Sequence, residues 1–142
     1  MREALGLARQ AEAIGEVPVG AVVVVDGQIV GRGFNSPIAK SDPTAHAEIL
    51  ALREAGFSVH NYRLEAATLY ATLEPCVMCA GALVAARVGR LVFGARDLRF
   101  GGVRSKFHLA DSEILNHRVE IVEGVLAAEC VELVMNFFDK RR

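Results

Sequence analysis

Residues 19–34 of the chain, VGAVVVVDGQIVGRGF, contain two apolar, largely β-branched runs on either side of the dipeptide Asp26-Gly27. Asp-Gly in this setting is a strong signal for a β-hairpin, because a type I′ turn needs positive φ at both of its central residues. Each run is too short for a buried helix, so we expect strands over 19–25 and 28–34. The sheet therefore contains at least one antiparallel pair.

Helical and extended patterns alternate outward from this hairpin. Before it, apolar residues from Leu5 to Ile14 recur at helical spacing, and Gly15 is suited to end that helix. After it come predicted helices and strands in alternation: helices over about 44–55 (stopped by Gly56), about 76–87 and from about 126, and strands over 67–73, 91–95 and 119–122. This order predicts a three-layer α/β fold, with helices on both faces of a mostly parallel or mixed sheet.

The length and composition point to one folded domain over residues 1–142. The chain is 52% hydrophobic and 23% charged, which excludes a disordered tail, a collagen-like chain and a highly charged coiled coil. No apolar run is long enough for a membrane span, and Met1-Arg2-Glu3 opens no signal peptide, so we expect a cytoplasmic protein with no membrane contact. In that reducing compartment, three cysteines favour metal or redox chemistry over disulfides.

The net charge of −1 conceals an uneven distribution. Residues 87–106 carry six Lys or Arg against Asp97 alone, a net of +5, while the segments on either side are each net −3. Such a strip is able to hold a few phosphates of a nucleic acid. The alternative is a solvated loop with scattered arginines.

Two short motifs carry the chemistry, and each stands at a predicted helix start. They are His46-Ala47-Glu48 and Glu74-Pro75-Cys76-Val77-Met78-Cys79. Alone, the second motif also fits a redox dithiol or half of a structural zinc site. Together they supply one imidazole and two thiols, which are ligands that zinc prefers. Three protein ligands leave a fourth position for water, as in a catalytic site.

Helix geometry supports this grouping. Cys76 and Cys79 lie three residues apart on one helix face, and His46 lies in the first turn of another helix. Two helix N-termini then converge on one ion, and their partial positive charge lowers the thiol pKa values. Glu48 points away from His46 but, at the helix tip, it is able to reach a water molecule on the metal. We expect it to act as a proton shuttle.

H-x-E followed by P-C-x-x-C is the signature of zinc deaminases that act on nucleobases. The resemblance extends over nearly the whole chain: it is similar to the bacterial tRNA-specific adenosine deaminases, of the cytidine/deoxycytidylate deaminase superfamily. The similar stretches are residues 17–22, 42–48, 61–63, 72–79, 92–97, 116–121 and the closing Phe137-Phe138 with the basic residues after it.

This resemblance implies a five-stranded mixed sheet of the cytidine deaminase type. It implies one Zn²⁺ per chain, with Glu48 as the general acid and base and with three ligands: His46, Cys76 and Cys79. The implied reaction is the hydrolytic deamination of adenosine to inosine at the wobble position of a tRNA anticodon, with release of ammonia. The implied partners are a tRNA anticodon stem-loop and a second copy of the chain in a homodimer.

The resemblance also implies three substrate contacts. Asn35 would bind the flipped base, Asp97 the sugar or backbone beside it, and Phe138, with the terminal arginines, the anticodon loop. The residues themselves leave alternatives open, because Asn35 also suits a turn and Asp97 also suits a pair with a neighbouring arginine. Of Phe137 and Phe138, one is expected to pack inward, and Cys130 is expected to be a buried, inert thiol.

Two other functions remain compatible with these motifs. One is the deamination of a free base or nucleoside, such as guanine or cytosine, on the same scaffold. That substrate has no phosphate backbone, so its binding would depend little on salt. The other is a non-enzymatic zinc or thiol module, which would have no need of Glu48.

Overall fold

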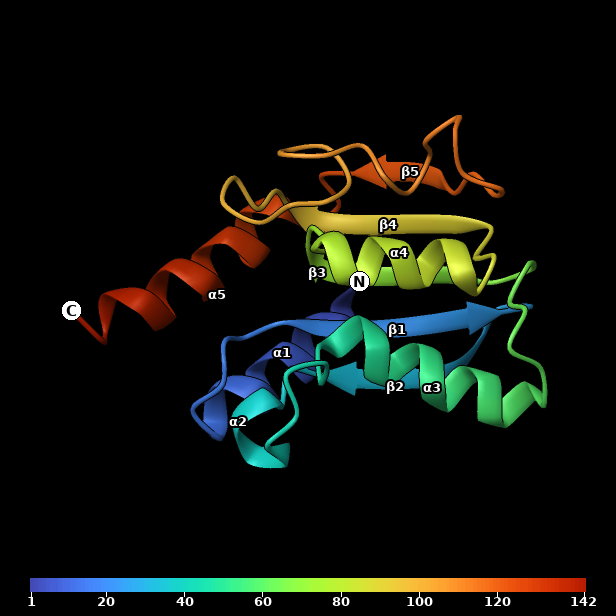
Figure 1. Ribbon diagram of the computed structural model, residues 1–142. Coiled ribbons are helices and arrows are strands. Elements are labelled where there is room, and N and C mark those ends of the chain that lie inside the picture. The colour runs from blue at the N-terminus through green and yellow to red at the C-terminus, as the bar shows by residue number, and fades with distance from the viewer.

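The computed structural model describes residues 1–142, which form a five-stranded sheet with helices packed on it (Figure 1). The strands are β1 (Gly20–Val25), β2 (Gln28–Phe34), β3 (Thr68–Leu73), β4 (Arg90–Ala95) and β5 (Glu120–Glu123). The helices are α1 (Arg2–Ala13), α2 (Pro37–Lys40), α3 (Ala47–Val59), α4 (Val77–Ala85) and α5 (Ala127–Asp139).

The sheet is mixed and has the strand order β2-β1-β3-β4-β5. Strand β1 pairs antiparallel with β2 and β3, whereas the β3–β4 and β4–β5 pairs are parallel. The predicted hairpin is confirmed: Asp26 has a φ of 50° and Gly27 a φ of 74°, as a type I′ turn requires. Antiparallel pairing at one edge and parallel pairing at the other give the mixed sheet that the resemblance implies.

Helices cover both faces of the sheet, so the predicted three-layer α/β fold is also confirmed. Helices α3 and α4 lie side by side on one face, and α1 and α5 pack on the other (Figure 1). The main hydrophobic core lies between the sheet and the α3–α4 layer and includes Leu69, Leu83, Leu91 and Phe93. The parallel strands β3 and β4 are therefore covered on both sides, as expected for an apolar run that does not alternate.

Helix α3 packs on β2 through glycine and alanine residues. A Cβ at Gly31 would collide with the carbonyl of Ala51, and one at Gly33 with the carbonyl of Ala47. These two glycines are two apart and share one face of the strand, while the alanines lie one helical turn apart. The backbones of strand and helix therefore approach closely, which fixes the N-terminal end of α3 against the sheet.

The bounds of α3 differ from those predicted. The helix begins at Ala47, not near Thr44, because His46 is extended (φ −76°, ψ 152°) and the carbonyl of Ala45 accepts the N–H of Ser36. At the other end Gly56 does not stop it. The left-handed residue is His60 (φ 55°), and the N–H of Asn61 closes the last turn on the carbonyl of Gly56.

The remaining differences are small. The predicted loop after β2 contains α2, a single turn that begins at Pro37. The other predicted helices and strands match the observed ones to within about three residues, which is the usual uncertainty at element ends. None of the helices has both the length and the apolar character that a membrane span requires.

Candidate active site

The candidate site lies where the N-terminal ends of α3 and α4 meet. His46 is the N-cap residue of α3, and Cys76 is the N-cap residue of α4. Strand β3 leads directly through Glu74 and Pro75 into α4, so the end of a buried strand fixes where that helix starts. The two helix termini present their partial positive charge to the same place, as predicted.

The structure brings together the three predicted ligands. The Nδ1 atom of His46 lies 3.6 Å from the Sγ atom of Cys76 and 3.6 Å from that of Cys79. All three donor atoms lie within 4.8 Å of one another. One imidazole and two sulfurs at this spacing fit a single zinc ion, and within this group no fourth protein ligand completes the set.

The two sulfurs are electrostatically coupled. A hydrogen bond from Cys79 lowers the pKa of the Cys76 thiol to about 4, and the same hydrogen bond, together with burial, raises the pKa of Cys79. Cys76 is therefore a thiolate at neutral pH, which is the form that binds metals. The hydrogen bond to Cys76 also raises the pKa of His46.

Glu48 is buried beside this group, with 3% of its surface exposed. Burial raises the pKa of its carboxyl to about 7, against the opposing effect of the nearby His46. Both protonation states are then populated near neutral pH. A carboxyl group with this pKa is suited to accept a proton in one step and to donate it in the next.

Glu48, His46 and Cys76 share one pocket of about 380 Å³. Its other lining residues come from four different segments: Val17, Val19, Asn35, Pro37, Leu73, Glu74, Asp97 and Phe100. This volume lies within the range of small-molecule sites in proteins. Cys79 is fully buried and is not among the residues that line the pocket.

Asn35 lines the pocket and is held in place by α3. Its Oδ1 atom accepts the backbone N–H of Ala47 at 3.0 Å, which satisfies one of the free N–H groups at the helix start. The side-chain carbonyl is thereby used, and the NH₂ group remains as the donor that Asn35 can offer to a ligand.

Asp97 lies at the rim, directly after β4. Its Oδ1 atom accepts the backbone N–H groups of Arg99 at 3.0 Å and Phe100 at 3.1 Å. Its ion pairing with an arginine, the alternative considered from the sequence, is absent. Asp97 thus shapes the turn that carries Phe100 and still borders the pocket.

Phe138 stands outside the pocket, on a neighbouring concave surface of about 650 Å³. Phe138 is 44% exposed, whereas Phe137 is 3% exposed and packs inward, as predicted. The two concave surfaces share Val17, Leu73, Asp97 and Phe100, so they are continuous. Cys130 is buried beside Leu5 and Ala95 and is not part of the His46, Cys76 and Cys79 group, so its predicted burial is confirmed.

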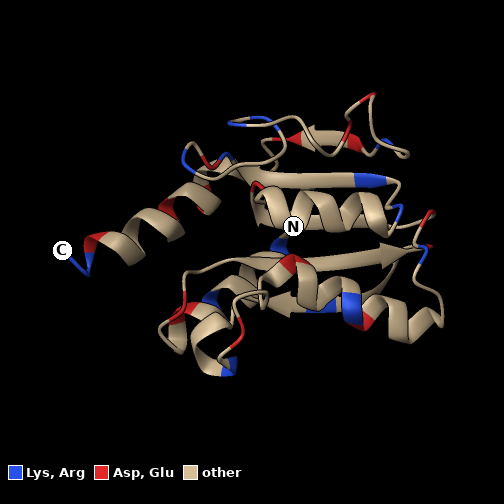
Figure 2. Ribbon diagram, viewed as in Figure 1, with Lys and Arg blue, Asp and Glu red and all other residues tan.

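Three of the six basic residues in the strip over 87–106 form ion pairs, so fewer of its positive charges are free than its net charge indicates. Arg90 pairs with Glu120, Arg96 with Glu123, and Arg104 with Asp111. The loop after β4 nevertheless lies at the same end of the molecule as the basic C-terminus (Figure 2). Four arginines line the concave surface that holds Phe138: Arg96, which pairs with Glu123, and Arg99, Arg141 and Arg142.

Sequence reasoning did not assign roles to several residues of the pocket. Val17 and Phe100 lie far from either motif in the sequence, and Leu73, directly before the second motif, carries no local signal of its own. Glu74 does carry one, because a carboxylate at the end of a buried strand, just before Pro75, needs partners.

Both the family model and the curated relatives that match this chain are deaminases. The profile of the MafB19-like deaminase family matches residues 1–142. The tRNA-specific adenosine deaminase of Haemophilus influenzae is 55% identical over 143 residues, which cover 100% of this chain and 83% of that protein.

Solved structures agree with these matches. One from a study of A-to-I editing by tRNA:A34 deaminases at the wobble position of transfer RNA has a TM-score of 0.90 and 41% identity. It covers 94% of this chain and 96% of its own. The guanine deaminase of Nitrosomonas europaea has a TM-score of 0.82 and 25% identity, over 96% of this chain and 81% of its own.

Proposed function

The chain belongs to the MafB19-like deaminase family and to the tRNA-specific adenosine deaminases, and from this membership we propose that it converts adenosine to inosine at the wobble position of a tRNA anticodon. The observation that carries the proposal is the position of Glu48, which is buried in one pocket with His46 and Cys76. The reaction consumes one water and releases one ammonia.

A zinc ion is the cofactor that suits this group, with one ion per chain held by His46, Cys76 and Cys79. The chemistry of the donors supports this, because imidazole and thiolate at 3.6 Å from one another select zinc over magnesium or calcium. When bound, zinc supplies acidity to water, lowering its pKa from 15.7 to about 7.

Glu48 moves the protons. It accepts one from the water whose oxygen attacks C6 of the adenine and delivers it to N1 of the ring. It then takes the proton of the hydroxyl now bonded to C6 and delivers it to the amino group, so that the C6–N bond breaks, ammonia leaves and a C6 carbonyl remains. One carboxyl group serves both steps, which agrees with a pKa of about 7 in a buried position.

Three residues are proposed to hold the RNA. The NH₂ group of Asn35 donates a hydrogen bond to the flipped base, since its carbonyl is occupied by Ala47. Asp97 contacts the sugar or backbone beside that base from the rim of the pocket. Phe138 contacts the neighbouring part of the anticodon loop, supported by its exposure on the adjoining concave surface.

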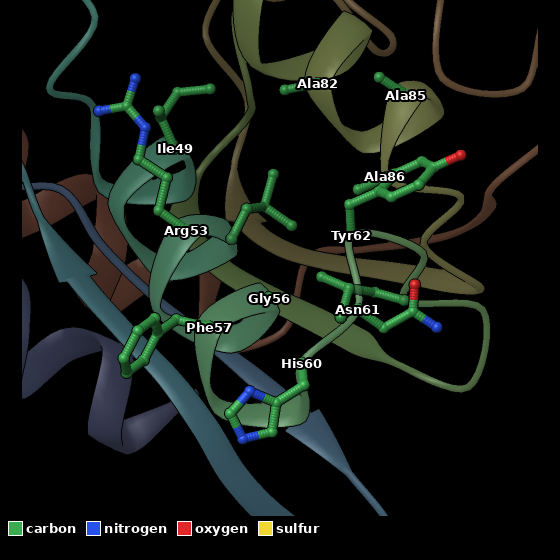
Figure 3. Close-up of a pocket in the computed structure, with 12 residues that line it drawn as sticks. Ile49, Arg53, Gly56, Phe57, His60, Asn61, Tyr62, Ala82, Ala85 and Ala86 are labelled. Atoms are coloured by element: carbon green, nitrogen blue, oxygen red, sulfur yellow. The ribbon is translucent and has the colours of Figure 1, made fainter.

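A homodimer is part of the proposal. A groove of about 670 Å³ runs between α3, α4 and the segment after α3, and it is lined mostly by apolar side chains (Figure 3). Two aromatic residues at its edge, Phe57 and Tyr62, are 81% and 70% exposed. The groove begins at Ile49, one turn after His46, so a second copy seated there would lie near the catalytic pocket. Sedimentation of wild type and Phe57→Glu tests this interface.

We also propose a cytoplasmic location. It is supported by the three cysteines of the chain, which are free thiols and suit a reducing compartment. Fractionation of cells that express the tagged protein tests the location directly.

The deciding experiment is incubation of the zinc-loaded protein with an anticodon stem-loop RNA that carries adenosine at the wobble position. Inosine is scored by mass spectrometry of the digested RNA, beside parallel reactions with free adenosine, cytidine and guanine. Inosine in the RNA, with no deamination of the free compounds, supports the proposal. Release of ammonia from guanine alone would instead assign the activity of the Nitrosomonas europaea relative.

A further inference from the structure

Glu74 is a buried carboxylate that the reaction described above does not use. It lies at the junction of β3 and α4, two residues before Cys76, and only 2% of its surface is exposed. A charge in such a position is costly unless it is fully hydrogen-bonded. Its partners therefore indicate what it does.

All of its partners belong to one loop, the segment from Asp97 to Ser105. The Oε2 atom accepts the backbone N–H groups of Val103 (3.1 Å), Arg104 (2.8 Å) and Ser105 (3.0 Å). The Oε1 atom accepts the N–H of Asp97 at 3.2 Å and the hydroxyl of Ser105. The two carboxylate oxygens thus accept five hydrogen bonds, and these come from both ends of the loop, at Asp97 and at 103–105.

The middle of the same loop lies against the turn that carries Cys76. Gly101 forms an antiparallel bridge with Cys76, and the N–H of Gly102 donates to the carbonyl of Pro75 at 2.8 Å. A Cβ at Gly101 would collide with the Oε2 atom of Glu74, and one at Gly102 would lie 2.8 Å from the Cys76 carbonyl carbon. The loop and the ligand-bearing turn are therefore packed backbone to backbone.

This loop forms the rim of the catalytic pocket through Asp97 and Phe100. We propose that Glu74 is a positioning residue that holds the 97–105 loop against the Pro75–Cys76 turn and so places the rim where the RNA substrate binds. The proposal depends on the proposed function, because it assigns the rim to RNA. Glu74 borders the pocket but acts through the loop, because its carboxylate oxygens accept hydrogen bonds only from residues of the 97–105 segment.

The test compares wild type with Glu74→Gln, in which an NH₂ group replaces one acceptor and faces N–H donors. We expect full zinc content, a kcat within about threefold of wild type, and a KM for the stem-loop RNA raised about tenfold or more, because a charged acceptor is lost. Amide hydrogen exchange at residues 103–105 should accelerate. Wild-type KM and exchange, or loss of zinc from the folded variant, would overturn the proposal.

If Glu74→Gln fails to fold, two variants of Ser105 test the same positioning role. Ser105→Ala removes one of the five donors, and Ser105→Thr keeps the hydroxyl. We expect KM to rise several-fold, about threefold to tenfold, in Ser105→Ala and to return in Ser105→Thr. Equal KM values in all three proteins contradict the inference. If wild type forms no inosine, the proposed function fails, whereas hydrogen exchange still reports on the hold of Glu74 on the loop.

Discussion

The Nδ1 atom of His46 lies 3.6 Å from the Sγ atom of Cys76, although 30 residues separate the two in the chain. Each residue is the N-cap of its own helix, so the contact joins the tips of α3 and α4. The close packing of α3 on the glycines of β2 and the direct connection of β3 to α4 both fix this junction.

Cys76→Ala should abolish zinc binding. Two remaining ligands hold the ion weakly, and because zinc binding contributes to folding, the thermal midpoint should also fall. Zinc per chain is measured by mass spectrometry of the metal. The matched control is Cys130→Ala, which removes another free thiol outside the site and should keep one zinc per chain. Retention of zinc by Cys76→Ala would exclude it from the ligand set.

Glu48→Gln should keep zinc and the fold but lose activity. Removal of a general acid and base costs about 10²- to 10⁴-fold in rate, and a neutral isostere in place of a buried carboxyl leaves stability unchanged or improved. Inosine formation and zinc content are measured on the same preparation. The exposed Glu65→Gln is the control, with wild-type activity expected. Normal deamination by Glu48→Gln would contradict its role.

The activity should depend on pH through Glu48. As a proton acceptor it must be ionised, and burial raises its pKa to about 7, so kcat/KM should fall as the pH drops below that value. A cation held by the three ligands favours the ionised form and moves the midpoint to pH 7 or lower. The profile is measured between about pH 5 and 9, with zinc content checked at each point. Activity that increases as the pH falls from 7 to 6 is incompatible with this assignment.

Gly33→Ala should destabilise the protein by about 1–3 kcal/mol, because the new Cβ collides with the Ala47 carbonyl and displaces the start of α3. His46 moves with that helix end, so zinc affinity should fall too. The control is Gly6→Ala in α1, where a Cβ meets nothing within 4 Å; it should stabilise by about 0.5–1 kcal/mol. Urea unfolding measures both. An unchanged free energy of unfolding in Gly33→Ala would contradict the close packing of α3 on β2.

Arg99→Ala should weaken RNA binding and make it less dependent on salt. Arg99 lines the concave surface beside the pocket and has no ion-pair partner, so it is free to bind a phosphate. The slope of log affinity against log salt should become shallower by about one unit. Arg90→Ala is the control, since Arg90 pairs with Glu120 at the opposite end of β4. Equal slopes for Arg99→Ala and wild type would assign the phosphate contacts elsewhere.

Local signals in the sequence were sufficient for the elements and for the type of chemistry. The turn at Asp26-Gly27 was predictable because its backbone conformation depends on those two residues alone. The grouping of His46 with Cys76 and Cys79 was predictable because each stands at a helix start and each is of a residue type that zinc prefers. The end of α3 was missed because a left-handed His60 closes the helix, and Gly56 carries the more usual signal.

Tertiary structure decided what surrounds those residues. Only the folded chain shows that Arg96 and Arg104 are neutralised by Glu123 and Asp111, that Phe100 reaches the pocket, and that the five donors to Glu74 come from a loop more than twenty residues away. Periodicity and turn chemistry encode the conformation of a few neighbouring residues. Contacts between distant segments depend on how the sheet and helices pack, which no short pattern specifies.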